Sequence, residues 1–413
     1  MIIRKIKETE LMEARNISSL CFGWPHDTKG KDMEEYIRET KENPTSKGDA
    51  YFLDTWAAFT DEGEMMSCIS VIPYDVTFDR NQLTMSGIGG VCTYPQHRRK
   101  GAVRECLRYA LQEMYEKGKC FSYLYAFSEK FYGNYGYIRS SASILWSFDL
   151  ATVPNDRYDG SFHLYRGDGN YSDYDLVYQS FAKKYNMMVQ RNSFDWDILK
   201  TANPFKGKRS AYLYKDITGK PCGYLVFEKS VENRQDILDC KEVIFDSFKT
   251  LKAIMSFAKT FSADYAKIQF CAPKSLTLDY FCDDYSQSSS YRKIKQNGMI
   301  RVINVKEVLR QATYKGNGEL TLYIHDPYLD KNNKKFHVTY KDGTAVKISA
   351  SVIAPEKQIK VDIEMTINQF SSTIVGNYDV ADFEYQEGIT LNCNSEKASD
   401  LFYRKPCWIN NFF

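Results

Sequence analysis

A short basic turn between a strand-like segment and an amphipathic segment constrains the fold more than any other feature of the chain. The turn, residues 98–104, reads RRKGAVR, follows the apolar, glycine-containing segment 89–95 and runs into helix-like spacing. The first N–H groups of a helix lack intrahelical partners, and the helix dipole adds about half a positive charge there. Three adjacent basic side chains add full charges, and Gly101 lets the backbone approach a ligand closely. This strand, turn and helix predict a pocket for a pyrophosphate, although a solvated helix start would show the same pattern.

A second element downstream strengthens this interpretation. Residues 122–127 (SYLYAF) are strand-like and are followed by 128–137 (SEKFYGNYGY), which favour a short helix with a Tyr-Gly-x-x-Gly-Tyr string. The chain therefore presents a strand, a basic turn, a helix, a strand and a short helix in that order. Within the first helix, apolar residues recur at i, i+3 and i+4 from about residue 96 to residue 117, which predicts one face packed on a sheet.

Composition limits the class of protein and the partners it can have. The chain has 413 residues, of which 43% are hydrophobic and 26% charged, so we expect a globular protein of two or three domains. A formal net charge of +2 gives no electrostatic case for nucleic acid binding. No apolar run approaches the roughly 20 residues that span a bilayer, and the N-terminus has no long apolar core, so we expect no membrane partner and a cytoplasmic location.

The cysteine pattern argues against a disulfide framework and against a zinc site. Eleven cysteines are scattered singly from Cys21 to Cys407, and the five histidines are equally dispersed. We expect reduced thiols that are mostly buried as small hydrophobic side chains, and no metal.

Three domains are predicted, with boundaries at 1–150, 151–295 and 296–413. The first has helices within 8–43, strands between 51 and 91, and the turn described above. The second repeats the same order of elements, but its corresponding turn, 246–250, has no glycine and one basic residue, so it is interpreted as a degenerate copy without a cofactor site. The third opens with the strand-like string 299–305, and four further segments alternate apolar and polar residues, which is typical of strands.

These strings resemble the GNAT superfamily of N-acetyltransferases and, over the whole length, the Eis (enhanced intracellular survival) family. The similarity lies in 91–101 (VCTYPQHRRKG), Ser128-Glu129, the Tyr132 to Tyr137 string, 299–305 and an aromatic C-terminus. Val103 departs from the family turn, which has Gly or Ala there. The resemblance implies an α/β (α+β) fold of tandem GNAT-like domains, each a mixed sheet flanked by helices, followed by a sterol-carrier-protein-like α+β domain.

The resemblance also implies acetyl-CoA as co-substrate and assigns residues to it. The residues implied to bind acetyl-CoA are Val91, Cys92, Thr93, Arg98, Arg99, Lys100, Gly101, Ala102, Val103, Arg104, Ser128 and Glu129. A backbone N–H at Val91 or Thr93 would polarise the thioester carbonyl. Tyr132 resembles the general acid that protonates the departing thiolate, with Tyr135 and Tyr137 as alternatives. The α-carboxylate of Phe413 resembles the base; the alternative is that the terminal aromatic side chains only fill an interface.

The expected acceptor is a small primary amine of aminoglycoside-like, polyamine-like or lysine-like chemistry. Phe22, Trp24 and Asp27 are candidates for binding it, although they fit an N-terminal packing cluster equally well. The family implies a homo-oligomer, a hexamer. Two other functions stay open: a non-catalytic acyl-CoA sensor, and a lipid or small-molecule carrier that uses the C-terminal domain.

Overall fold

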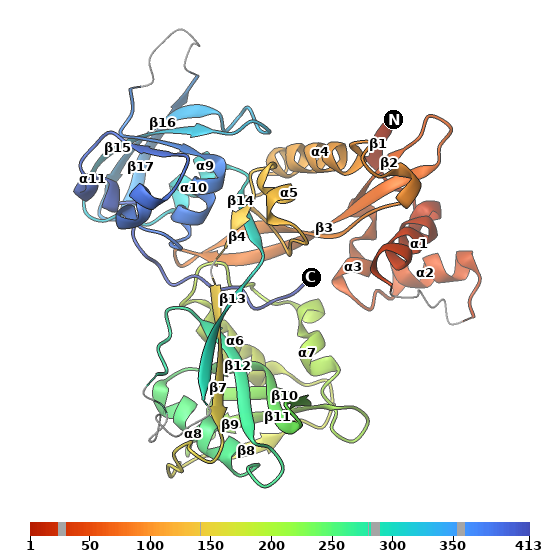
Figure 1. Cartoon of the computed structure of the whole chain (residues 1–413), viewed down its shortest axis with the longest axis vertical. Coiled ribbons are helices and arrows are strands. Elements are labelled where there is room, and N and C mark those ends of the chain that lie inside the picture. Colours follow the sequence, from red (N-terminus) through yellow and green to blue (C-terminus); the bar gives the residue numbers. More distant parts are fainter. Residues whose placement is uncertain (24–29, 141, 280, 282–289, 353–359) are drawn as a thin grey trace. The chain divides into compact units, whose positions relative to one another are not determined.

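The computed structural model describes residues 1–23, 30–140, 142–279, 281, 290–352 and 360–413. The chain forms two compact units (Figure 1). The first comprises Met1–Ser140, Gly298–Lys405 and Asn411–Phe413, and the second comprises Ser141–Asn297 and Pro406–Asn410. The chain thus passes from one unit to the other at four points, and its last eight residues are divided between the units.

A seven-stranded sheet organises the N-terminal part of the first unit. In spatial order its strands are β1 (Ile2–Lys5), β2 (Thr55–Phe59), β3 (Met65–Phe78), β4 (Asn81–Thr93), β5 (Phe121–Leu124), β14 (Met299–Val302) and β6 (Ile138–Arg139). Its helices are α1 (Leu11–Phe22), α2 (Met33–Glu42), α3 (Lys47–Ala50), α4 (Ala102–Glu116) and α5 (Glu129–Gly133). All neighbours are antiparallel except β4 and β5, which α4 joins as a crossover helix.

The amphipathic pattern of α4 is confirmed. Its buried residues are Ala102, Cys106, Leu107, Ala110, Leu111 and Met114, which repeat at three and four positions. They form one core cluster with side chains of β3, β4 and β5 such as Ile69 and Ile88. Burying six such side chains fixes the start of α4 against the sheet.

The second unit repeats this architecture. Its sheet runs β8 (Ser161–Leu164), β9 (Arg209–Lys215), β10 (Pro221–Glu232), β11 (Gln235–Phe245), β12 (Lys267–Pro273), β7 (Ala142–Asp149) and β13 (Tyr291–Gln296). Its helices are α6 (Ser172–Ala182), α7 (Asp197–Lys200) and α8 (Phe248–Lys259). The parallel pair again stands in the fourth and fifth places, β11 and β12, and α8 joins them. The predicted tandem fold is confirmed by this strand-for-strand match.

The two sheets exchange one strand each. The sixth strand of the first sheet is β14, which comes from the sequence that follows the second unit, and the sixth strand of the second sheet is β7, which comes directly after β6. The string 299–302 was interpreted as the opening of the third domain, but it pairs with β5 and β6 instead. Both exchanged strands are labelled in Figure 1.

The C-terminal part of the first unit is a smaller α+β domain. Its five-stranded sheet runs β17 (Thr344–Ser351), β16 (Lys334–Lys341), β15 (Gly318–His325), β18 (Ile363–Thr366) and β19 (Ile389–Leu391). Its helices are α9 (Val305–Gln311), α10 (Ile367–Ile374) and α11 (Ser395–Ser399). The domain also has a 3-10 helix, η5 (Val380–Tyr385), and the rest of the described chain has η1 (Glu8–Glu10), η2 (Phe52–Asp54), η3 (Pro95–His97) and η4 (Ser193–Trp196). No described helix is long and apolar enough to cross a bilayer.

Candidate active site

Strand β4 separates from β5 halfway along its length. The parallel pairing covers Met85–Ile88 against Phe121–Leu124, while β4 continues to Thr93 against β3 alone. On the β3 side the register shifts between Cys68 and Ser70, which leaves two β4 residues opposite one β3 residue, a bulge. The backbone of 89–93 is thus released from β5, and its N–H groups on that side can reach a ligand.

The basic turn joins this open strand to α4. Pro95 starts a separate 3-10 turn, and Arg99 and Gly101 have positive φ of 64° and 81°, so α4 begins at Ala102 and not near residue 96 as the apolar spacing predicts. Gly101 is the N-cap, a position where a left-handed backbone favours glycine. The N-terminal N–H groups of a 15-residue helix therefore face the end of β4 beside three cationic side chains.

A cavity of about 700 Å³ lies at this junction. Its lining residues are Cys21, Phe22, Val91, Cys92, Thr93, His97, Arg98, Arg99, Gly101, Ala102, Val103, Arg104, Phe127, Phe131 and Tyr135. Nine of the twelve residues predicted to bind the cofactor are among them. The other three do not line the cavity: Lys100, Ser128 and Glu129. The Lys100 ammonium lies 3.3 Å from Nδ1 of His97. Ser128 caps α5, and Glu129 forms an ion pair with Arg139.

The predicted amine-binding residues are only partly described. Phe22 lines the cavity and is 42% exposed. Trp24 and Asp27 lie outside the described residues. Phe22 therefore stays a candidate for contact with the acceptor.

The three tyrosines of the Tyr-Gly-x-x-Gly-Tyr string have different surroundings. Tyr132, on α5, is 2% exposed and packs edge-on against Phe131 at 5.0 Å and Phe127 at 5.4 Å between ring centroids. Burial, followed by the neighbouring Tyr137 and Tyr135, raises the pKa of the Tyr132 phenol, so it is protonated at neutral pH. Burial also raises the pKa of Tyr137 to about 12, and its hydroxyl is hydrogen bonded to Ser122 at 2.6 Å. Tyr135 lines the cavity directly.

Residues that follow the second unit in the sequence hold this tyrosine string in place. Arg301, on β14 and fully buried, donates to the Tyr135 carbonyl and to both carboxylate oxygens of Asp326, each at 2.8 Å. Gly136 leaves room for that guanidinium, because a Cβ there would lie 1.6 Å from Nη1 of Arg301. Asn368, on α10, donates to the carbonyls of Gly133 and Tyr137, both at 2.9 Å. The conformation of residues 133–137 therefore depends on groups more than 160 residues away.

The C-terminal residue lies against β4 where the strand begins to open. The Phe413 ring packs on Tyr74 at 4.6 Å and on Tyr125 at 5.5 Å. Its carboxyl carbon lies 3.8 Å from the position that a Cβ on Gly89 would occupy, and its ring fills the space beside Gly87.

Further contacts fix the end of the tail within the same unit. The Tyr125 hydroxyl donates to the Asn411 carbonyl, and the ammonium of the buried Lys47 lies 4.0 Å above the Tyr74 ring. The neighbouring terminal aromatic residue, Phe412, is 78% exposed.

In the second unit, a buried ion pair follows the corresponding opening. Beyond Cys240, β11 leaves β12 and pairs only with β10. The Glu242 carboxylate at this point accepts hydrogen bonds from Arg191 at 2.7 Å and 3.0 Å and from Tyr224 at 2.7 Å. Asn410 of the tail, which belongs to this unit, also donates to Glu242. The second unit therefore has a buried ion pair at the strand opening that corresponds to the one beside the cavity in the first unit.

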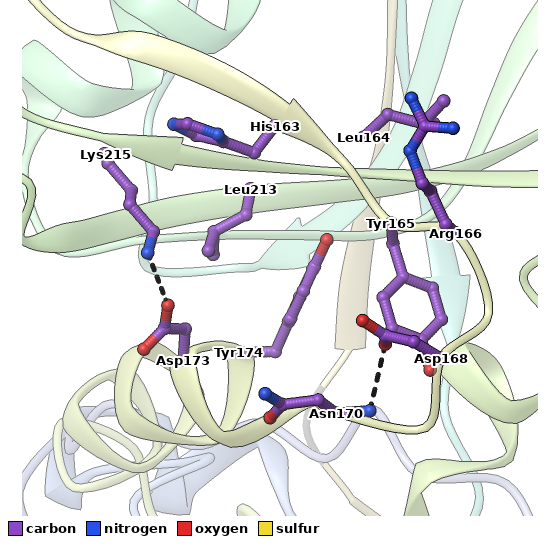
Figure 2. Close-up of a pocket in the computed structure, with 10 residues that line it drawn as sticks. All are labelled: His163, Leu164, Tyr165, Arg166, Asp168, Asn170, Asp173, Tyr174, Leu213 and Lys215. Carbon is purple, nitrogen blue, oxygen red and sulfur yellow. Dashed lines mark hydrogen bonds and ion pairs between the residues drawn. The ribbon is translucent and has the colours of Figure 1, made fainter.

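The second unit has a cavity elsewhere, between β8, β9 and α6 (Figure 2). It has a volume of about 210 Å³ and is bordered by the ion pair of Lys215 and Asp173, 2.7 Å apart. Tyr174 extends from α6 toward the strands beside Leu213. The residues that line this cavity do not include the N-terminus of α8, which corresponds to the basic turn.

Several site residues were not identified from the sequence. Four of them lie around the C-terminal residue, namely Lys47, Tyr74, Gly87 and Tyr125. The fifth, Arg301, supports the tyrosine string. One signal was available: glycines at 87, 89 and 90 inside a strand-like segment favour a close approach of another chain segment or a ligand. Among the described residues, no group of three or more His, Cys, Asp or Glu side chains could hold a metal ion.

Comparison with known families and structures agrees with this geometry. Residues 2–139 match the family described as acetyltransferase (GNAT) domain, and residues 305–410 match the sterol carrier protein domain. No curated protein matches the chain significantly.

Three solved structures share the fold over the whole chain. A GCN5-related N-acetyltransferase from Anabaena variabilis has a TM-score of 0.83 at 19% identity, with both chains fully covered. Eis1 from Mycobacterium abscessus has a TM-score of 0.79 at 15% identity, again with both chains fully covered. A GCN5-related N-acetyltransferase from Kribbella flavida has a TM-score of 0.78 at 15% identity and is 98% covered, with all of this chain aligned. The chain therefore carries an N-terminal GNAT acetyltransferase domain and a C-terminal sterol-carrier-protein domain, and its fold over the whole length is similar to that of Eis1.

Proposed function

We propose that the protein is an acetyl-CoA-dependent N-acetyltransferase that acetylates small primary amines. One observation carries the proposal: the terminal carboxylate and the cofactor cavity meet the same stretch of β4. The carboxyl carbon of Phe413 lies beside Gly89, and the cavity is lined by Val91, Cys92 and Thr93 a few residues further along. A base and an acyl donor can therefore be brought to one short segment of open strand.

The cavity fits a CoA ester in charge and size. A volume of about 700 Å³ lies within the usual range for ligand pockets, about 300–1,000 Å³. The N-terminus of α4 and the side chains of Arg98, Arg99 and Arg104 supply N–H donors and positive charge for a pyrophosphate. The apolar lining by Phe127 and Phe131 suits the uncharged pantetheine arm.

The proposed chemistry is direct transfer. The neutral amine nitrogen forms a bond to the thioester carbonyl carbon, and the C–S bond breaks. The Phe413 carboxylate takes the amine proton, while the Tyr132 phenol gives its proton to the departing sulfur. A backbone N–H at Val91 or Thr93 stabilises the carbonyl oxygen as charge develops. The buried, protonated phenol and the released strand support these roles.

The decisive experiment measures acetylated product by mass spectrometry with acetyl-CoA and a panel of polyamines, aminoglycosides and lysine peptides. The wild-type chain is compared with a chain extended by one glycine after Phe413, which displaces the carboxylate by about 3.5 Å. We expect product from the wild type, loss of about 100-fold in kcat for the extended chain, and unchanged CoA binding. CoA binding without any product would favour the acyl-CoA sensor, and no CoA binding would favour the carrier.

A substitution that fills the space of the Phe413 ring tests the role of the tail position without changing the last residue. A Cβ at Gly87 would lie 2.5 Å from Cε2 of Phe413, so Gly87→Ala should displace the ring and lower kcat by about 100-fold, because small misplacements of reacting groups are costly. Gly89→Ala places its Cβ 3.8 Å from the carboxyl carbon, an ordinary contact, and should cost less. Equal losses in steady-state kinetics would argue against a specific tail position.

Removing one cation from the turn tests the cofactor site. Arg98→Ala should raise the KM for acetyl-CoA about tenfold and leave the KM for the amine unchanged, because a hydrogen bond to a charged group contributes about 1.5–3 kcal/mol. The matched control is Arg108→Ala, which removes an exposed arginine of α4 that pairs with Glu105. An effect of similar size in both variants would mean that general surface charge, and not the turn, attracts the cofactor.

A further inference from the structure

Two cysteine thiols face each other across β3 and β4 beside the cofactor cavity. Cys68 and Cys92 are directly opposite in the antiparallel register, and their Sγ atoms lie 3.4 Å apart. Both side chains are buried, with exposures of 3% and 4%. Opposite residues in an antiparallel pair have Cα atoms about 4.5–5.5 Å apart, within the range that a disulfide requires.

The cysteine pair lies next to the bulge between β3 and β4, on the stretch of β4 that lines the cofactor cavity. The bulge begins directly after this pair, between Cys68 and Ser70 on β3. The Cys92 thiol also contacts the Gly90 carbonyl at 3.3 Å, and Cys92 lines the cavity. A small oxidant that enters the cavity can therefore reach Cys92, as it can reach Cys21, whereas Cys68 does not line the cavity.

The two thiols are not equivalent. The hydrogen bond with Cys92, followed by burial, raises the pKa of the Cys68 thiol, so Cys68 is protonated at neutral pH. Cys68 is not a cavity-lining residue, whereas Cys92 is. Access from the cavity assigns Cys92 as the thiol of this pair that is oxidised first, and the enclosed Cys68 as the thiol that resolves it.

We propose that Cys68 and Cys92 form an intramolecular disulfide when the protein meets a hydroperoxide, and that this modification closes the acetyl-CoA site reversibly. The Cys92 sulfur attacks the peroxide oxygen, the O–O bond breaks, and a sulfenic acid and an alcohol (or water) result. The Cys68 sulfur then displaces the hydroxyl group, which leaves as water with the second thiol proton. Two thiols are oxidised by two electrons in total, and one peroxide is reduced.

The disulfide changes the site because it shortens one contact. An S–S bond measures about 2.05 Å, whereas the two sulfurs are 3.4 Å apart in the reduced chain. Because the opposite backbone positions already suit a disulfide, the bond forms by rotation of both side chains and turns the Cys92 sulfur away from the Gly90 carbonyl. The Cys92 side chain, which lines the cavity, then changes position and alters the lining at the open stretch of β4. This consequence rests on the proposed function, but formation of the bond does not.

The test treats the full-length protein with hydrogen peroxide, blocks the remaining thiols and maps peptides without reduction. We expect a cross-linked peptide pair containing Cys68 and Cys92, a rise of at least about tenfold in the KM for acetyl-CoA, and recovery with dithiothreitol. Cys68→Ser should lose the cross-link and the reversible inhibition. Cys120→Ser, which removes another buried thiol of the same unit, should keep both.

Each outcome bears on the proposal separately from the enzyme activity. Peptide mapping needs no turnover, so an inactive protein still reports whether the bond forms. A map without this pair, or with Cys92 linked to Cys21 or Cys106, would overturn the modification site. A complete cross-link with unchanged acetyl-CoA binding would overturn its regulatory effect.

Discussion

Replacing Tyr132 by Phe is expected to lower kcat by about 10²- to 10⁴-fold, the usual contribution of a general acid. The substitution removes one hydroxyl and keeps the ring that packs on Phe127 and Phe131, so the fold should be unaffected. Because the raised pKa keeps the phenol protonated through the neutral range, its proton is available to the leaving thiolate at any physiological pH. Steady-state kinetics with mass detection of the product would measure the loss.

Two neighbouring tyrosines provide the matched controls. Tyr137→Phe removes a hydroxyl that is hydrogen bonded to Ser122 and should reduce stability more than catalysis. Tyr135→Phe alters a residue that lines the cavity and should change kcat less than Tyr132→Phe. If Tyr135→Phe instead abolished turnover while Tyr132→Phe did not, the acid would be Tyr135.

Replacing Arg301 by Met is expected to destabilise the first unit by about 3–5 kcal/mol, because it leaves a buried carboxylate without its counter-charge. Both side chains of the pair are fully buried, and Asp326 also accepts hydrogen bonds from Asn332 and from the N–H groups of Tyr328 and Leu329. These donors hold the carboxylate in place after the arginine is lost, so its charge stays buried. Urea-induced unfolding would measure the change.

The control for this prediction is an exposed arginine. Arg108→Met removes an ion pair whose arginine is 51% exposed, and such pairs contribute at most about 1 kcal/mol. Combining Arg301→Met with Asp326→Leu should recover much of the loss, because the uncompensated charge is then absent. No recovery in the double variant would mean that Arg301 stabilises the unit through its contact with the Tyr135 carbonyl instead.

The local sequence determined the basic turn and the helix face that packs in the core of the GNAT domain. The basic turn, the apolar face of α4 and the order of strands and helices all follow from spacing within about 20 residues, and the structure confirms the buried face. The start of α4 was predicted a few residues too early, because the apolar period does not record the positive φ at Arg99 and Gly101.

Only the tertiary structure decided which strands complete each sheet, where the C-terminus lies and what supports the tyrosine string. Strands β7 and β14 pair with β12 and β5, whose residues lie more than 100 positions away in the sequence. The sequence does not show that the Phe413 ring lies beside Gly87, or that the Arg301 guanidinium lies beside Gly136, where φ is also positive at 85°. Helix and strand propensity and apolar periodicity describe one element at a time. The contacts named here form only when segments far apart in the sequence pack together, so neither property predicts them.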